Sequence, residues 1–183
     1  MAPSEFKTTG SLITALFERY KANMQQIATG ILKDVNEADD VVQDAMVKII
    51  KNIHMVDDID SRRCANFVYT IVKNTALDVF RKKQKEMEQL VTNDVSDFVN
   101  IIGEEIDFDV FESDYGFSEE MQEYLSQLKE MDKDIICLRY GNDFSDEEIS
   151  TLLGIGPDAV RKRLSRARTH LAEIIKERRK ANG

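Results

Sequence analysis

Residues 145–176 constrain the fold most, because they carry the start and stop signals of two helices joined by a tight turn. Ser145, followed three residues later by Glu148, forms a capping box at the start of the first helix. Gly154 can end that helix in a left-handed conformation without steric cost. Pro157 suits the first position of the second helix, where no backbone donor is needed. The spacing predicts a helix-turn-helix motif.

The second helix of this segment is amphipathic and has a strongly basic outer surface. Its apolar positions recur at steps of four and three residues, which predicts a buried face of Val160, Leu164, Ala167, Leu171 and Ile174. Its other faces carry Arg161, Lys162, Arg163, Ser165, Arg166 and Arg168. A basic amphipathic helix is often only a solvated surface, but here it follows a capped helix and a glycine turn. The combination favours DNA binding, with the second helix in the major groove.

The composition favours an all-α fold of one ordinary domain or two small ones. Of the 183 residues, 42% are hydrophobic and 32% are charged, so a core can form, while only 8 Gly and 2 Pro interrupt helices. No uncharged run approaches the roughly 20 residues that a membrane-spanning helix needs. The N-terminus lacks a basic-then-apolar signal pattern. We therefore expect a cytoplasmic protein without membrane insertion.

Charge is distributed very unevenly along the chain. The interval between Lys85 and Lys129 contains no Lys or Arg and thirteen acidic residues. Because the whole chain carries a formal charge of −9 and this interval carries −13, the remainder carries +4. Local charge governs the encounter with DNA more than net charge does. The sequence thus predicts two mildly basic parts joined by an acidic linker.

The first part, residues 1–85, is expected to form a helical domain. Apolar residues recur at helical spacing in three segments, so we expect helices near residues 12–31, 36–53 and 65–85. Ile50 belongs to the apolar stripe of the second of these helices. The third helix ends in a basic cluster and also carries a polar stripe of Asn66, Thr70, Lys73, Asn74, Asp78 and Arg81.

The second and third parts differ sharply in pattern. Residues 86–116 form the acidic linker, in which apolar residues alternate with acids without clear periodicity. They are open to three interpretations: an amphipathic strand, a docking segment or a largely disordered tether. Residues 117–183 are expected to form a small all-α domain of four helices that ends in the helix-turn-helix.

No catalytic or metal site emerges from the sequence. There is no Gly-rich phosphate loop, no G-x-S-x-G and no H-E-x-x-H motif. Cys64, Cys137, His54 and His170 lack the spacing of a zinc site, so we interpret them as two reduced core thiols and two surface histidines. The sequence predicts no enzymatic activity, no metal and no cofactor.

Three segments of the chain share one family resemblance: EADDVVQDAMVKIIKNI, NFVYTIVKNTALDVFRKKQK and LKEMDKDIICLRYGNDFSDEEISTLLGIGPDAVRKRLSRARTHL. Together they resemble bacterial RNA polymerase sigma factors of the small two-domain extracytoplasmic-function (ECF) group. In order, they are similar to the helix that binds the clamp of the polymerase largest subunit, the helix that melts and reads the minus-ten promoter element, and the domain that reads the minus-thirty-five element. The resemblance implies a sigma factor that binds core RNA polymerase and promoter DNA and directs transcription initiation.

The resemblance also implies roles for residues of the first part. The clamp is expected to be bound by Asp40, Gln43, Asp44 and Met46. The minus-ten element is expected to be contacted by Phe67, Lys73, Asn74, Arg81 and Lys82. Phe67 stands where many relatives have Trp, so it offers a base less stacking area. Asn74 stands where relatives help to hold a flipped base, and the cations attract phosphates.

In the second domain, the resemblance implies contact with the minus-thirty-five element. The major groove is expected to be reached by Arg161, Lys162, Ser165 and Arg166, whereas Arg163 and Arg168 touch phosphates or pair with acids. The chain departs from many relatives at Pro157–Asp158, where they carry Ser or Thr, and at Lys162, which takes the second place of a usual basic–Ser pair. The linker would thread the positively charged cleft and RNA exit path of the polymerase. Many ECF sigma factors also bind an anti-sigma protein.

Two other classes of function stay open on the sequence. A free-standing helix-turn-helix repressor or activator usually dimerises to match two half-sites, but this chain shows no heptad zipper. An all-helical adaptor that binds only proteins is disfavoured by the six basic or hydroxyl positions of the recognition helix.

Overall fold

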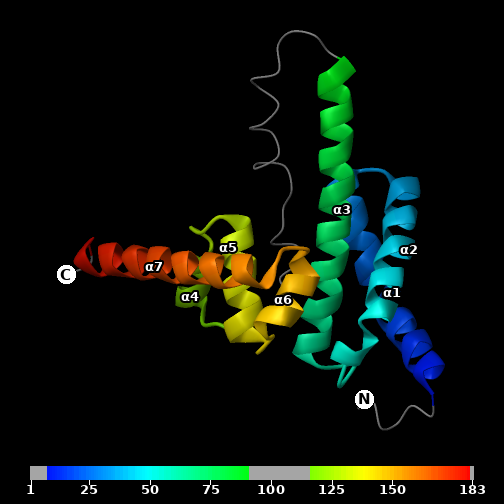
Figure 1. Ribbon diagram of the computed structural model, residues 1–183, viewed down its shortest axis with the longest axis horizontal. Helices are drawn as coiled ribbons and strands as arrows, with labels where there is room; N and C mark the ends of the chain where they lie inside the picture. The colour runs from blue at the N-terminus through cyan, green and yellow to red at the C-terminus, as the bar shows by residue number, and fades with distance from the viewer. Residues whose placement is uncertain (1–7, 91–115, 182–183) are drawn as a thin grey trace. The chain divides into compact units, whose positions relative to one another are not determined.

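Two compact helical units make up the protein, as its computed structural model shows for residues 8–90 and 116–181. The first unit contains α1 (Thr9–Leu32), α2 (Val35–Lys51), the short 3-10 helix η2 (Ile53–Met55) and α3 (Arg62–Leu90). The second contains α4 (Glu119–Leu125), α5 (Glu130–Ile136), the π-helical turn η5 (Cys137–Gly141), α6 (Asp146–Leu153) and α7 (Pro157–Ala181) (Figure 1). Every element in these described ranges is helical, which confirms the all-α prediction. Linker residues 91–115 lie outside the described residues.

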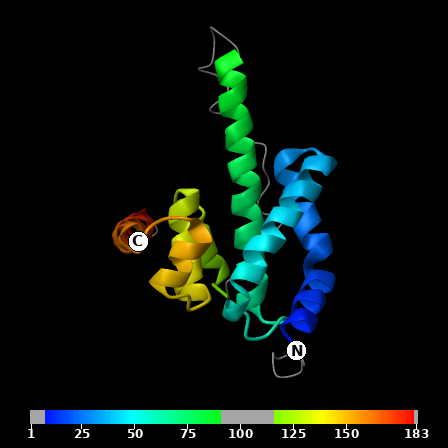
Figure 2. The same ribbon diagram turned by 45° about the vertical axis from the view of Figure 1, so that its right-hand side comes forward.

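In the first unit, α1, α2 and α3 pack against one another around a single core (Figure 2). Its fully buried side chains include Leu16, Met24, Ile49, Phe67 and Val68. The turn between α1 and α2 uses Lys33 in the left-handed region, with φ 56°, followed by Asp34 as the N-cap of α2. One Asp34 carboxylate oxygen accepts the backbone N–H groups of residues 36 and 37 at 2.9 and 3.0 Å. The predicted start near Asn36 was therefore slightly late, because Asp34 satisfies the first free donors of the helix.

α3 begins at a loop that is fastened to α1. The Tyr20 hydroxyl donates to the carbonyl oxygen of Ile59 at 2.6 Å, and Arg19 pairs with Asp60 at 3.3 Å. α3 then runs to Leu90, past the ends of α1 and α2 (Figures 1 and 2). Its predicted end at residue 85 was too early, so the first residues assigned to the linker are helical.

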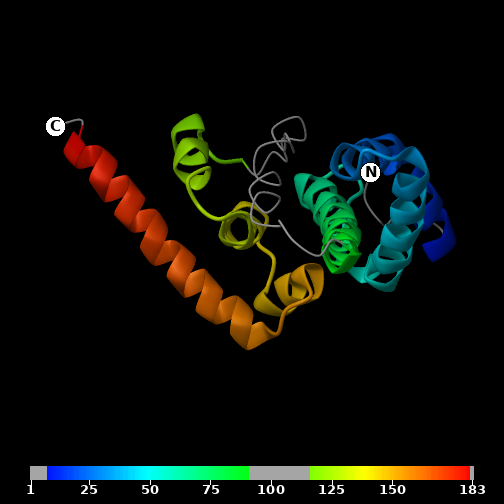
Figure 3. The same cartoon turned by 90° about the horizontal axis from the view of Figure 1, so that it is seen from above.

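In the second unit, α4, α5 and α6 all contact α7 and lie on the same side of it (Figure 3). A core cluster joins α4 to α7 through Tyr124, Leu125 and Leu128 on one side and Ala167 and Ile174 on the other. One long helix therefore carries the motif's second half and also organises the small domain around it.

The thiols and histidines lie where the sequence predicted. Cys64 and Cys137 are buried thiols that form no disulfide with each other, and His54 and His170 are exposed. Desolvation raises the pKa of the Cys64 thiol to about 11, which keeps it protonated near neutral pH. Within the described ranges, no cluster of His, Cys, Asp and Glu could hold a metal ion. No helix there is long and apolar enough to span a membrane.

Candidate polymerase and nucleic-acid interfaces

The helix-turn-helix has the local geometry that its sequence predicted. The Ser145 backbone N–H donates to Glu148 Oε2 at 2.7 Å, and the Glu148 N–H donates to Ser145 Oγ at 3.2 Å, which completes the capping box. Gly154 caps α6 in the left-handed region, with φ 65°. The Ser150 hydroxyl donates to the carbonyl oxygen of Ile155 at 2.5 Å and holds the turn. α7 begins at Pro157, as expected.

α7 turns its basic residues away from the core of the second unit. Val160, Ala167 and Ile174 are buried, and Leu164 and Leu171 are half-buried, as the apolar spacing predicted. The four side chains expected in the major groove are all exposed: Arg161, Lys162, Ser165 and Arg166. Positions three and four apart share a helix face, so these four lie together on about two turns of α7.

Two arginines in the first turns of α7 pair with acids, in different settings. Arg161 forms an ion pair with Asp158, three residues earlier, and both side chains are largely exposed. Arg163 Nη1 pairs with Asp132 Oδ1 at 3.0 Å, where the side chains are only 34% and 17% exposed, so this pair fastens α7 to α5. The structure confirms that Arg163 pairs with an acid. The exposed Arg161 pair contributes little to stability, so a DNA phosphate or base can replace its carboxylate partner.

The polar stripe predicted on α3 is largely enclosed. Asn66, Thr70 and Lys73 are only 1–2% exposed, and the Phe67 ring is fully buried. The Lys73 ammonium lies 5.4 Å from the centre of the Tyr69 ring. The predictions that Phe67 offers a stacking surface and that Lys73 attracts phosphates therefore disagree with this structure, since neither side chain presents a surface to solvent.

The later residues of the α3 stripe are accessible. Asn74 is half-buried, whereas Arg81 and Lys82 are exposed. Arg81 lies 3.6 Å from Asp78, and Lys82 lies 4.0 Å from Glu86. Exposed pairs of this kind within one helix are weak and are screened by salt. Of the α3 cations expected to contact the minus-ten element, the accessible ones thus lie in the C-terminal half of the helix.

α2 presents a second exposed surface, with acidic and apolar residues side by side. Asp40, Gln43 and Asp44 are exposed, and Met46 is half-buried. Val47 and Ile50 are 50% and 42% exposed, although Ile50 was expected in the core. Val47 follows Gln43 by four residues, so it belongs to the same face. The spacing could have found Val47, but only the packing shows that Ile50 is left uncovered.

A helical unit with an acidic and apolar surface, joined to a helix-turn-helix unit with a basic surface, defines a DNA-binding protein with a separate protein-binding face. Residues 16–86 match Sigma-70 region 2, and residues 118–171 match Sigma-70, region 4. The chain belongs to the sigma-70 family of RNA polymerase sigma factors, and within it to the ECF group.

The chain is similar to several individual proteins. The ECF RNA polymerase sigma factor SigW of Bacillus subtilis (strain 168) is 25% identical over 162 residues, covering 86% of each chain. The RNA polymerase sigma factor SigV of the same organism is 26% identical over 161 residues, covering 88% of this chain and 89% of the relative. A solved structure of the sigma factor RpoE in complex with the anti-sigma factor NepR, from Bartonella quintana, is 20% identical with a TM-score of 0.40, covering 87% and 94% of the two chains.

Family membership determines the general activity. A sigma factor binds core RNA polymerase and promoter DNA and directs transcription initiation, without an enzymatic activity of its own. The protein is therefore not a free-standing repressor or activator.

Proposed function

We propose that three helices divide the contacts of initiation: α2 binds the polymerase clamp, α3 contacts the minus-ten element, and α7 reads the minus-thirty-five element. The observation that carries this proposal is the exposed basic face on the first turns of α7, directly after a well-formed turn. On this basis residues 1–85 and 117–183 act as two binding domains and residues 86–116 connect them.

The α7 surface has dimensions that suit the major groove. Arg161 and Arg166 are five residues apart, so they lie about 7.5 Å apart along the helix axis. The groove is roughly 12 Å wide and admits a helix of this kind. Arginine can donate two hydrogen bonds to guanine, which lets Arg161 or Arg166 discriminate between bases. Lys162 and Ser165 lie between them, and Arg168 is placed to contact the flanking phosphates.

The α2 surface has the make-up of a protein-binding site. Val47 and Ile50 provide apolar contact area, and Asp40, Gln43 and Asp44 surround it with polar groups. Interfaces commonly combine an apolar centre with a polar rim. The clamp segment that fits here is apolar at its centre and basic at its edge. Met46 is half-buried and lies four residues before Ile50, so it adds to the apolar centre of this surface.

Of the residues expected to contact the minus-ten element, we propose direct contacts only for the accessible ones. Asn74 is the polar side chain that we assign to a flipped base, and Arg81 and Lys82 are the cations that we assign to backbone phosphates. Phe67 and Lys73 keep a supporting role in the packing of α3 rather than a direct contact.

Two further assignments follow from this activity. The protein acts in the cytoplasm, where it meets core polymerase and promoter DNA. An anti-sigma protein that covers the α2 and α7 surfaces would hold it inactive. The relative RpoE of Bartonella quintana forms a complex with a protein of this kind, the anti-sigma factor NepR.

Two variants of the full chain test the assignment of the α2 surface to core polymerase and of the α7 surface to DNA. Asp40→Lys with Asp44→Lys should weaken binding to core polymerase by at least about tenfold, or ~1.4 kcal/mol, because the variant presents positive charge to a basic partner. Arg161→Ala with Arg166→Ala should bind core polymerase normally and lose transcripts from promoters that carry the upstream element. Loss of both activities in both variants, with the fold intact by circular dichroism, would overturn the division.

A further inference from the structure

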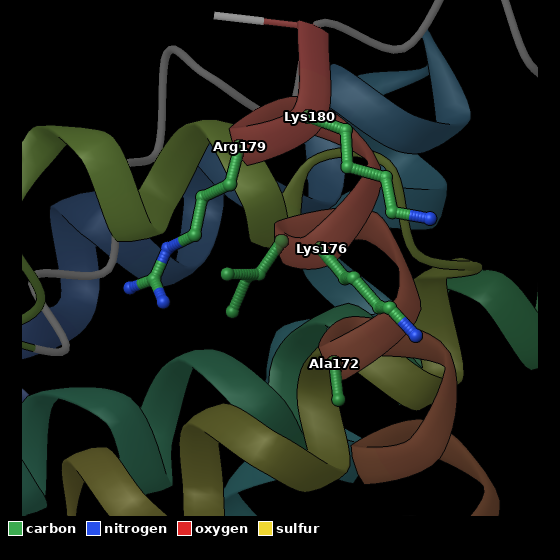
Figure 4. A pocket seen from close by; sticks show the side chains of 5 residues that line it. Ala172, Lys176, Arg179 and Lys180 are labelled. Carbon is green, nitrogen blue, oxygen red and sulfur yellow. The ribbon is translucent and has the colours of Figure 1, made fainter. Parts of the chain in front are cut away.

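A shallow hollow lies on the exposed side of α7 near its C-terminal end, after the last residue that matches Sigma-70 region 4. Ala172 and Ile175 form its apolar part, and Lys176, Arg179 and Lys180 surround it. In Figure 4, Arg179 extends to one side of the hollow, and Lys176 and Lys180 extend to the other. The site combines a small apolar surface with three cations.

The hollow is separate from the residues that we assign to the major groove. Arg161 and Lys176 are fifteen residues apart, which places them about 22 Å apart along the helix axis. A ligand of the free protein can therefore occupy the hollow without contacting the first turns of α7.

Two exposed acids lie beside the hollow: Glu173 is three residues before Lys176, and Glu177 is three residues before Lys180. With three cations against two acids, this side of α7 keeps a small positive excess. Arg178, the remaining cation of this turn, is directed to α4: it pairs with Glu123 and lies 5.5 Å from the centre of the Tyr124 ring. Arg178 thus holds α4 against the end of α7 and takes no part in the hollow.

The chain enters α4 close to this hollow. Phe117, just before α4, packs on the cluster that contains Tyr124 and Ile174, and Ile175 packs on the same cluster. Ile175 also lines the hollow. Phe117, at the start of the second unit, therefore shares a cluster with a residue that lines the hollow.

We propose that the hollow on α7 binds residues 104–114 of the same chain, EEIDFDVFESD, in the free protein. The segment carries six acids and four apolar residues, Ile106, Phe108, Val110 and Phe111. Its carboxylates complement Lys176, Arg179 and Lys180, while an apolar side chain covers Ala172 and Ile175. A short tether gives it an effective concentration on the order of millimolar, so weak contacts are enough for occupancy.

The segment is long enough to reach. Residue 110 is six residues before Gly116, and six extended residues span about 20 Å. The cations occupy little more than one turn of α7, or about 6 Å of helix from Lys176 to Lys180. The extended length of the tether is thus several times the length of helix that the cations occupy.

The test uses the full chain, alone in solution, with the photoreactive residue p-benzoylphenylalanine in place of Phe108. After irradiation at low salt, mass spectrometry should find cross-links on the α7 peptide that contains residues 172–180. The triple variant Lys176→Gln, Arg179→Gln and Lys180→Gln should reduce that yield about tenfold, and raising the salt to about 0.5 M should do the same, because the contact depends on charge. The triple variant Arg161→Gln, Lys162→Gln and Arg166→Gln removes the same charge from the same helix and should leave the yield unchanged.

Three results would overturn the proposal. One is the absence of cross-links to residues 172–180. Another is an equal loss of yield in both triple variants, which would indicate a general effect of charge. The third is cross-linking between isotope-labelled and unlabelled chains in a mixture, which would make a second copy the occupant. Neither polymerase nor DNA is present, so the result is independent of the proposed division of promoter contacts.

Discussion

α3 and α7 are both long helices that carry a stripe of polar residues beside a stripe of apolar ones, yet they use the polar stripe differently. On α7 the basic positions Arg161, Lys162 and Arg166 are exposed. On α3 the polar positions Asn66, Thr70 and Lys73 are buried. α3 packs against both α1 and α2, whereas α4, α5 and α6 lie on one side of α7 and leave its other side exposed. Sequence spacing assigns residues to a face, and the tertiary packing around that face decides whether it meets solvent.

The largest expected effect concerns Phe67, whose ring is buried in the core of the first unit. Phe67→Ala should lower the free energy of unfolding by about 3–5 kcal/mol, because it leaves a cavity in a closely packed core. Urea denaturation measures the change, and Phe67→Leu should cost less than about 1.5 kcal/mol. If Phe67→Ala keeps its stability but fails to open promoter DNA, Phe67 is a stacking surface after all and the contrast with α7 disappears.

A smaller effect is expected on the exposed side of α7. Arg161→Ala or Arg166→Ala should weaken binding to a duplex with the preferred upstream element by about 1–3 kcal/mol, with little effect on other sequences. The stability of either variant should stay within about 0.5 kcal/mol of the wild type. Arg168→Ala is the matched control and should weaken all sequences alike, as a lost phosphate contact does. A uniform loss with Arg161→Ala would move Arg161 to the phosphate backbone.

The smallest effect distinguishes two arginines of the same helix. A double-mutant cycle between Arg163 and Asp132 should give a coupling energy of about 0.5–1 kcal/mol, because the pair is partly buried and joins two helices. The cycle between Arg161 and Asp158 should give less than about 0.5 kcal/mol, since that pair is exposed. Thermal or urea unfolding measures both. Equal coupling energies would show that the burial of the Arg163 pair does not make it more stabilising than the exposed Arg161 pair.

Signals that act within a few residues were readable from the sequence. The capping box at Ser145, the left-handed Gly154 and the start of α7 at Pro157 each depend on local backbone geometry, and the structure confirms them. The apolar stripes likewise predicted which residues share a face. The sequence therefore indicated the helices, the all-α fold and the exposed basic surface of α7.

Features that depend on contacts between residues distant in the sequence could not be predicted from the sequence. Ile50 has the spacing of a core residue, but no helix covers it fully. Lys73 has the polarity of a surface residue, yet it is enclosed. The partner of Arg163 lies thirty-one residues away in the sequence. The π-helical turn at Cys137–Gly141 also had no signal, although Arg139 Nη1 donates to the carbonyl oxygen of Phe144 at 2.9 Å beyond its end.

The attachment of the loop before α3 has a mechanical consequence. Tyr20 and Arg19 fix Ile59 and Asp60 at the base of a helix of 29 residues, about 43 Å long. Because the N-terminal end of α3 is attached to α1, a tilt of roughly 5° about that end displaces the C-terminal end by about 4 Å, given that length. Nearer the C-terminal end, Lys83 is paired with Glu37 in the first turn of α2. If α3 contacts melting DNA as we propose, this pair links the part of α3 near the DNA to the start of the helix that we assign to the polymerase clamp.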